Sequence, residues 1–205
     1  MAQSNQDPIT AAPTADEVTM RADGRRNYDR LLETARAAFA QQGTDVSLRE
    51  VARSAGVGIG TLYRHFPTRE ALIEACMRHG LDLLCARAGA LLDAPSPDDA
   101  LMQWLHALAV SSATYQGLPG SLLAALQDET SELHRSCRAM AAAAGALLDR
   151  AQQHGTVRSD LATGDLLALA AAVAWAAQQT PDPERLRAVL LDAFRNGIAD
   201  RQPAQ

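Results

Sequence analysis

Apolar residues recur at helical spacing along most of the chain. The first such stretch ends at Gly43, and its apolar positions lie three or four residues apart: Tyr28, Leu31, Leu32, Ala35 and Phe39. The strict alternation of apolar and polar residues that indicates β-strands is not found in any convincing run. The pattern therefore predicts an all-α protein.

Two short helices are predicted next. Ser47 and Glu50 have the spacing of a capping box, in which each side chain satisfies a free backbone amide at the start of a helix. Gly56 is expected to end this helix. The following one carries Leu62 and Phe66 four residues apart on one face, and the proline after Phe66 ends it.

The remainder of the chain is also predicted to be helical. Thr68 can cap a fourth helix, with Glu70 in its first turn, and this helix is expected to run to about Leu92. Five more helices are predicted. They start at Asp98 or Asp99, follow the break at 117–120, run from about Ser131 to His154, run from Asp165 to Ala177, and run from beyond the prolines at 181 and 183 to about Asn196.

The charge is unevenly distributed over three predicted parts. Residues 1–20 lack periodicity, carry a net charge of −3 and are expected to form a disordered tail. Residues 21–80 contain ten arginines against seven acidic residues, whereas residues 81–205 contain nine arginines against fourteen. A basic segment on an acidic body predicts local contact with a polyanion and argues against a protein that coats nucleic acid.

Residues 47–66 have the composition that two short helices need in order to cross at a steep angle. Ala52 is small where the second helix passes over the first, and Gly56 supplies the turn. The shared core is expected to contain Val51, Ala55 and Leu62. This pattern predicts a helix-turn-helix, whose second helix lies in the major groove of DNA.

At these residues the chain resembles the tetracycline-repressor (TetR) family. The resemblance covers about residues 25–77 and is most specific in the run GTLYRHFPTRE at residues 60–70. It implies a homodimeric transcriptional regulator, usually a repressor, in which each three-helix N-terminal domain reads half of a palindromic operator. It also implies an α-helical C-terminal domain that dimerises and often binds a small molecule that weakens DNA binding.

Eleven residues are expected to bind DNA. Gly58 and Gly60 allow close approach of the backbone, Thr61 offers a hydroxyl and a methyl group to base edges, and Arg49 can contact guanine in bidentate fashion. The resemblance implies phosphate contacts for Tyr63 and His65 and a phosphate clamp at Arg69. The full set is Ser47, Leu48, Arg49, Gly58, Ile59, Gly60, Thr61, Tyr63, Arg64, His65 and Arg69.

Packing roles remain open for several of these side chains. The alternative for Tyr63 is a half-buried packing role, for His65 it is capping or packing, and for Arg49 it is a solvated face. Ile59 stands where many relatives carry a polar residue, so it can touch a thymine methyl or simply be exposed.

The C-terminal half contains the predicted dimer interface. The segment 166–177 is apolar nearly all round, so it must be buried on more than one side, and a second copy can cover the side that the monomer leaves open. An ordinary intramolecular bundle is the alternative. The expected interface residues are Leu166, Leu169, Ala172, Val173, Ala176, Leu190 and Phe194.

A pocket for a small-molecule effector is also expected in this half. Aromatic, soft and polar side chains of the kind that line ligand sites occur along it, although each is individually more typical of a core. The candidate lining residues are Met102, Trp104, His106, Tyr115, Gln116, Met140 and Trp175.

Other classes of function have less support from the sequence. No nucleophile elbow, phosphate-binding glycine loop or zinc-protease motif is found, so no enzyme activity, cofactor or metal is predicted. His134 and Cys137 have helical ligand spacing, but no second pair completes a metal site. A regulator controlled by a protein partner or by thiol oxidation remains the alternative.

The cellular location follows from two further features. Cys76, Cys85 and Cys137 are too few and too scattered for a disulfide framework, which favours a reducing cytoplasm. No run of about 18 apolar residues occurs, so neither a transmembrane helix nor a membrane partner is expected.

Overall fold

The computed structural model is all-α over the residues that it describes, which are 15–115, 118 and 120–198. The predicted fold class is confirmed. In these ranges the helices are α1 (Ala15–Gln42), α2 (Leu48–Ser54), α3 (Ile59–His65), α4 (Arg69–Leu91), α5 (Pro97–Ala113), α6 (Gly120–Gln127), α7 (Glu132–Gln153), α8 (Thr163–Ala177) and α9 (Pro183–Ile198). None of them is long and apolar enough to cross a bilayer.

The first helix begins earlier than the sequence predicted. Residues 15–20, expected to belong to the tail, form the first turns of α1. Residues 1–14 of the predicted tail lie outside the described residues.

The predicted capping box at the start of α2 is not formed. Ser47 is the N-cap residue, but its side chain makes no capping hydrogen bond, because the Glu50 amide donates to the Ser47 carbonyl at 3.0 Å instead. The Thr68 cap is present at the start of α4, where its hydroxyl oxygen accepts from the Ala71 amide at 3.1 Å.

One hydrophobic core joins α1, α2, α3 and the first half of α4. Leu31, Phe39 and Leu62 are essentially inaccessible to solvent in it. Leu122 of α6 and Leu133 of α7 belong to the same core, so two of the later helices also help to stabilise the N-terminal helices.

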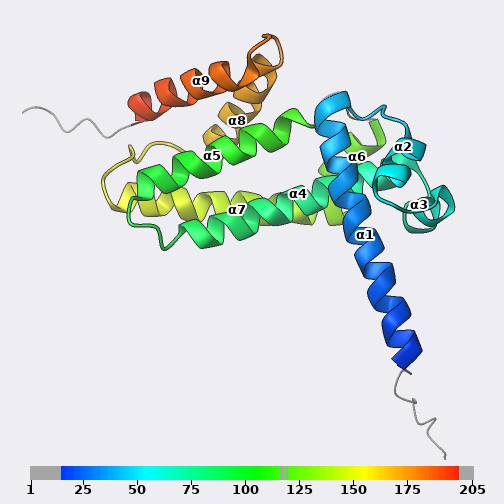
Figure 1. Ribbon diagram of the computed structural model, residues 1–205. Helices are drawn as coiled ribbons and strands as arrows, with labels where there is room; N and C mark the ends of the chain where they lie inside the picture. The colour runs from blue at the N-terminus through cyan, green and yellow to red at the C-terminus, as the bar shows by residue number, and fades with distance from the viewer. Residues whose placement is uncertain (1–14, 116–117, 119, 199–205) are drawn as a thin grey trace, which may run out of the picture.

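A second core joins α4, α5, α7, α8 and α9. Trp104 lies within it and is fully buried, and its indole N–H donates to the Leu84 carbonyl at 2.9 Å. Figure 1 shows α4 and α7 side by side, α1 to α3 at one end and α8 and α9 on the far side of α5. The boundary expected near residue 80 falls inside α4, so one continuous helix serves both cores.

Candidate functional site

A tight turn sets the angle between α2 and α3. Gly56 has a φ of +68°, a left-handed conformation that other residues adopt at a cost. The Val57 amide closes the turn by donating to the Ala52 carbonyl at 3.0 Å. Ala52 is 1% exposed, which places this small residue where the two helices cross. This arrangement is a helix-turn-helix.

The outer face of α3 is open to solvent. A Cβ atom added at Gly58 or Gly60 would meet no atom within 4 Å, so no other part of the protein covers the backbone at these two positions. Tyr63 is 48% exposed, Arg64 is exposed beside it, and Leu62 faces inward. The face can therefore approach a nucleic acid groove closely without any change in the core.

His65 combines packing with partial exposure. Its ring meets the Tyr28 ring edge-on at a centroid distance of 5.8 Å, and the Phe66 ring lies 5.1 Å from Tyr28. This cluster ties the end of α3 to α1 and fixes the orientation of the imidazole. Both roles considered for His65, packing and contact with phosphate, are compatible with this position.

The side chains at the start of α2 divide between core and surface. Ser47 and Arg49 are exposed, as a contact with DNA requires. The Leu48 side chain is 6% exposed and belongs to the N-terminal core, which corrects the expectation that it faces DNA; only its backbone amide remains available. Ile59 is half-buried against the same core, and Thr61 is half-buried.

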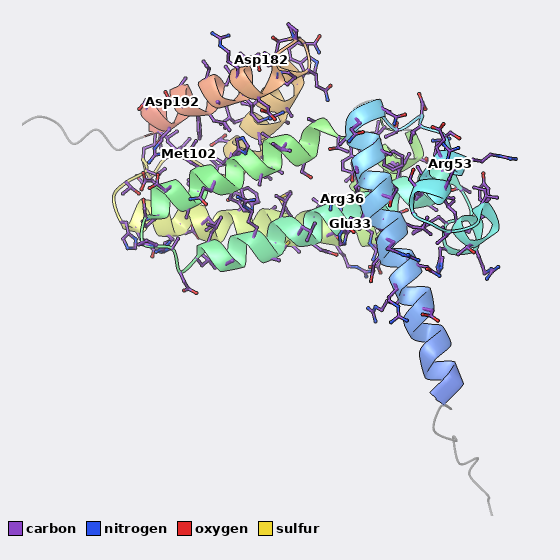
Figure 2. The ribbon with its side chains drawn as sticks, in the orientation of Figure 1. Glu33, Arg36, Arg53, Met102, Asp182 and Asp192 are labelled. Atoms are coloured by element: carbon purple, nitrogen blue, oxygen red, sulfur yellow. The ribbon has the colours of Figure 1, made fainter. Side chains whose placement is uncertain are left out.

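Arg53 and Glu50 lie on the exposed side of α2. They form an ion pair at 3.9 Å. Figure 2 shows Arg53 pointing away from the body of the molecule. An exposed pair at this distance contributes little to stability, so Arg53 is available to an anionic partner.

Arg69 anchors the loop that precedes α2. One nitrogen of its guanidinium, Nη1, donates to the Thr44 carbonyl at 2.8 Å and to the Val46 carbonyl at 2.7 Å. These bonds connect the first turn of α4 to the loop between α1 and α2. Arg69 therefore positions the N-terminus of α2, a role that the sequence did not predict.

Comparison with known proteins identifies both halves of the chain. Residues 31–76 match the family of bacterial regulatory proteins named tetR, and residues 96–200 match the C-terminal domain of SbtR-like transcriptional regulators. The chain belongs to the TetR family of transcriptional regulators. Members of this family are DNA-binding regulators and not enzymes.

Two solved TetR-family structures extend the similarity to most of the chain. A TetR transcriptional regulator from Streptomyces coelicolor is 34% identical, with a TM-score of 0.71 over 85% of this chain and 99% of that one. A TetR regulatory protein from Mycobacterium vanbaalenii is 31% identical, with a TM-score of 0.62 over 88% and 99%.

Curated relatives match a shorter stretch of the chain. An HTH-type transcriptional regulator of Staphylococcus aureus is 35% identical over 65 residues, which are 31% of this chain and 35% of the relative. The match thus spans about a third of the length of such relatives.

The residues expected at the dimer interface of this TetR-family chain fall into two groups. Leu166 and Val173 are 0% and 2% exposed and pack into the core of the monomer, which corrects their assignment. The others are partly or fully exposed, and three of them, Leu169, Leu190 and Phe194, also pack against the C-terminal core; the remaining two are Ala172 and Ala176.

Most residues expected to line an effector pocket lie elsewhere. Trp104 and Met140 are core residues, and Trp175 is 62% exposed on the surface of α8. Tyr115 packs against the N-terminal core. Gln116 lies outside the described residues. Side-chain chemistry does not indicate which face of a helix a residue occupies, so an effector contact at these residues stays a prediction.

His106 and Met102 do line cavities. His106 lies in the wall of a cavity of about 820 Å³ between α1, α4 and α5. Both residues line a second cavity, of about 360 Å³, beside α9. The larger cavity also involves Arg36 and Arg87, which the sequence reasoning missed. Arg36 shares a helical face with Leu32, but Asp29 and Glu33 lie at helical spacing from it as well, so the pattern of charges did not single it out.

Proposed function

We propose that this chain is a homodimeric repressor that binds a palindromic operator through α2 and α3 and is released by a small-molecule effector. The observation that carries the proposal is the open face of α3, where Gly60, Tyr63 and Arg64 are exposed over a fully packed helix-turn-helix. Side chains that are not needed for folding are thereby left free to bind DNA.

The charge of this surface supports contact with phosphates. Arg49 on α2 and Arg64 on α3 form no ion pair among the described residues, and Arg53 pairs only at 3.9 Å. Each arginine that neutralises a phosphate on binding releases counterions, so operator affinity should fall steeply with salt concentration.

An exposed apolar surface supports the homodimer. Trp175 on α8 is 62% exposed and Val189 on α9 is 51% exposed, and Ala172 on α8 is exposed as well. A large aromatic residue in such a patch is typical of the centre of an interface. In a symmetric dimer, α8 and α9 of both copies would form a four-helix interface.

The thiols give little support to redox control. Burial raises the pKa of Cys76 to about 12 and also raises the pKa values of Cys85 and Cys137. Thiolate is the reactive form, so these cysteines are less reactive than a free thiol near neutral pH. A small-molecule effector is therefore the better-supported form of control.

The test is fluorescence anisotropy with DNA from upstream of the gene that encodes the chain, with scrambled DNA for comparison, at two salt concentrations. Tyr63→Ala and Arg49→Ala should each weaken specific binding by about tenfold or more, because each removes a hydrogen bond to a charged or base-edge group. Arg138→Ala, an exposed arginine on α7, serves as the matched control and should bind normally.

Two results would contradict the proposal. One is that no DNA fragment captured genome-wide by the protein binds it more tightly than scrambled DNA does. The other is full operator affinity in the Tyr63→Ala and Arg49→Ala variants, which would place the DNA-binding surface elsewhere.

A further inference from the structure

We propose that the cavity between α1, α4 and α5 binds a small aliphatic carboxylate, and that Arg36 couples this anion to the DNA-binding helices. The coupling rests on the function proposed above, whereas binding of the carboxylate does not. The cavity measures about 820 Å³, within the range of sites that hold small organic ligands.

The charge of the cavity wall points to an anionic ligand. Arg36 of α1 and Arg87 of α4 both line it, and the wall contains no aspartate or glutamate. Neither arginine forms an ion pair within the described part of the chain. His106 and Ser111 add polar groups from α5. A carboxylate would supply the missing negative charge through charge-assisted hydrogen bonds, for which guanidinium geometry is well suited.

Arg36 lies where α1, α4 and α5 meet (Figure 2). A Cβ atom at Gly80 of α4 would lie 3.5 Å from the Ser111 Oγ and 3.7 Å from the Arg36 Nη2. Because residue 80 has no side chain, these two polar groups approach α4 at the same point. A single carboxylate group is small enough to contact both of them.

The surroundings of Arg36 do not neutralise its charge. Burial, with a smaller contribution from the nearby Cys76, raises the pKa of Tyr115 to about 12, although Arg36 opposes the shift. Both neighbours are therefore neutral at pH 7. The buried Tyr115 hydroxyl has no hydrogen-bond partner among the described residues. The guanidinium thus lies beside groups that stay uncharged, which leaves it available to an anion from solvent.

The apolar part of the cavity wall indicates what kind of chain the carboxylate is attached to. Leu83, Leu84 and Val110 provide apolar surface, together with alanines of α1 and α5. The lining contains no phenylalanine, tyrosine or tryptophan on which a flat aromatic ring would stack. An aliphatic chain that ends in a carboxylate fits this combination of two arginines and a branched aliphatic wall.

The position of Arg36 on α1 provides the coupling. Leu32 and Phe39 of the same helix pack into the core that supports α2 and α3, whereas Arg87 and His106 belong to α4 and α5. A carboxylate held by Arg36 and Arg87 would restrict the angle between α1 and the other two helices. If the operator requires a different angle, ligand and DNA weaken each other by the same factor.

The binding test uses octanoate as the probe, with 1-octanol as the uncharged control, in calorimetric titration and thermal unfolding. Octanoate should bind saturably and raise the Tm by about 2 °C or more, because it binds the folded state alone. Arg36→Gln, Arg87→Gln and Val110→Trp should each reduce octanoate affinity at least tenfold. Val110→Trp fills the cavity while keeping both arginines, and Arg138→Gln on α7 should leave binding unchanged.

Octanoate binding no tighter than that of 1-octanol, or unaffected by the three cavity variants, would overturn the site. Coupling is then measured by operator anisotropy: octanoate should weaken operator binding of the wild-type protein at least fivefold and have a smaller effect on Arg36→Gln. An unchanged operator affinity in the presence of bound octanoate would overturn the coupling. Failure to bind any operator would instead overturn the proposed function, while calorimetry still decides the site.

Discussion

Among single residues, the two glycines in the turn between α2 and α3 are expected to differ in how well they tolerate substitution by alanine. Gly56 has a φ of +68°, and Gly58 has a φ of −71°. Because a side chain in the left-handed region clashes with the backbone, Gly56→Ala should lower the free energy of unfolding by about 1–2 kcal/mol. Urea denaturation followed by circular dichroism measures this change.

The matched control is Gly58→Ala, two residues further along the same turn. A Cβ atom at either position would meet nothing within 4 Å, so the two substitutions differ in backbone conformation and not in available space. Gly58→Ala should change stability by less than about 0.5 kcal/mol. Equal destabilisation by both substitutions would show that left-handed geometry is not what the turn requires of Gly56.

Only some features of the individual DNA-binding candidates could be predicted from the sequence. The exposed positions of Arg49, Tyr63 and Arg64 were predictable, because the apolar stripe of a short helix leaves a defined outer face. The buried side chain of Leu48 and the loop contacts of Arg69 were not. Both depend on how the loop before α2 closes onto α4, and no local pattern encodes that contact.

At the scale of elements, an ion-pair network attaches the last helix to α5. Arg195 of α9 donates to Asp98 at 2.7 Å and to Asp99 at 2.5 Å, both in the first turn of α5. Because these side chains are substantially exposed, Arg195→Gln should lower the free energy of unfolding by only about 0.5 kcal/mol at pH 7. Arg185→Gln, on the same helix without an ion pair among the described residues, is the control.

The effect of Arg195→Gln should depend on pH. A hydrogen bond from Ser96, with a smaller contribution from Arg195, holds the pKa of Asp98 below its ordinary value of 3.8. A carboxylate of this kind stabilises the fold above its unfolded-state pKa, and this contribution is lost as the pH falls through the folded-state pKa. The stability difference from wild type should therefore shrink between pH 5 and about pH 3. A constant or growing difference would contradict this role for the pair.

Helix periodicity predicted most elements, and the exceptions have physical causes. Proline, glycine and capping residues marked the ends of α4 and α7 to within a few residues. The start of α1 was missed because residues 15–20 have no apolar stripe of their own and extend a helix that is nucleated further along. In α8, apolar residues on all sides left open which face is the core, and the structure assigns Leu166 and Val173 to it.

At the scale of the whole molecule, α4 links the two cores. Its first half shares a core with α1 to α3, and its second half packs against α5 and α7. Arg36 and Arg87 line the cavity beside it. They could not be grouped from the sequence, because the two residues are 51 positions apart along the chain and lie on different helices. A ligand at this junction acts on both cores at once.

The proposed dimer can be tested at Trp175. This side chain is 62% exposed on α8, so replacing it cannot open a cavity in the monomer. Trp175→Glu would place a charge at the centre of the proposed interface of α8 and α9, where it has no partner and is costly to desolvate. We expect a folded monomer in light scattering at concentrations where the wild-type protein is dimeric.

Leu123→Glu is the control for a change of exposed apolar surface to charge, because Leu123 is 50% exposed on α6 and outside the proposed interface. It should leave the dimer intact. The Trp175→Glu monomer should also bind a palindrome far more weakly, because two half-sites must be occupied together by one particle for tight binding. If Trp175→Glu remains a dimer of unchanged mass, the interface does not involve Trp175 of α8, and the proposed interface is wrong.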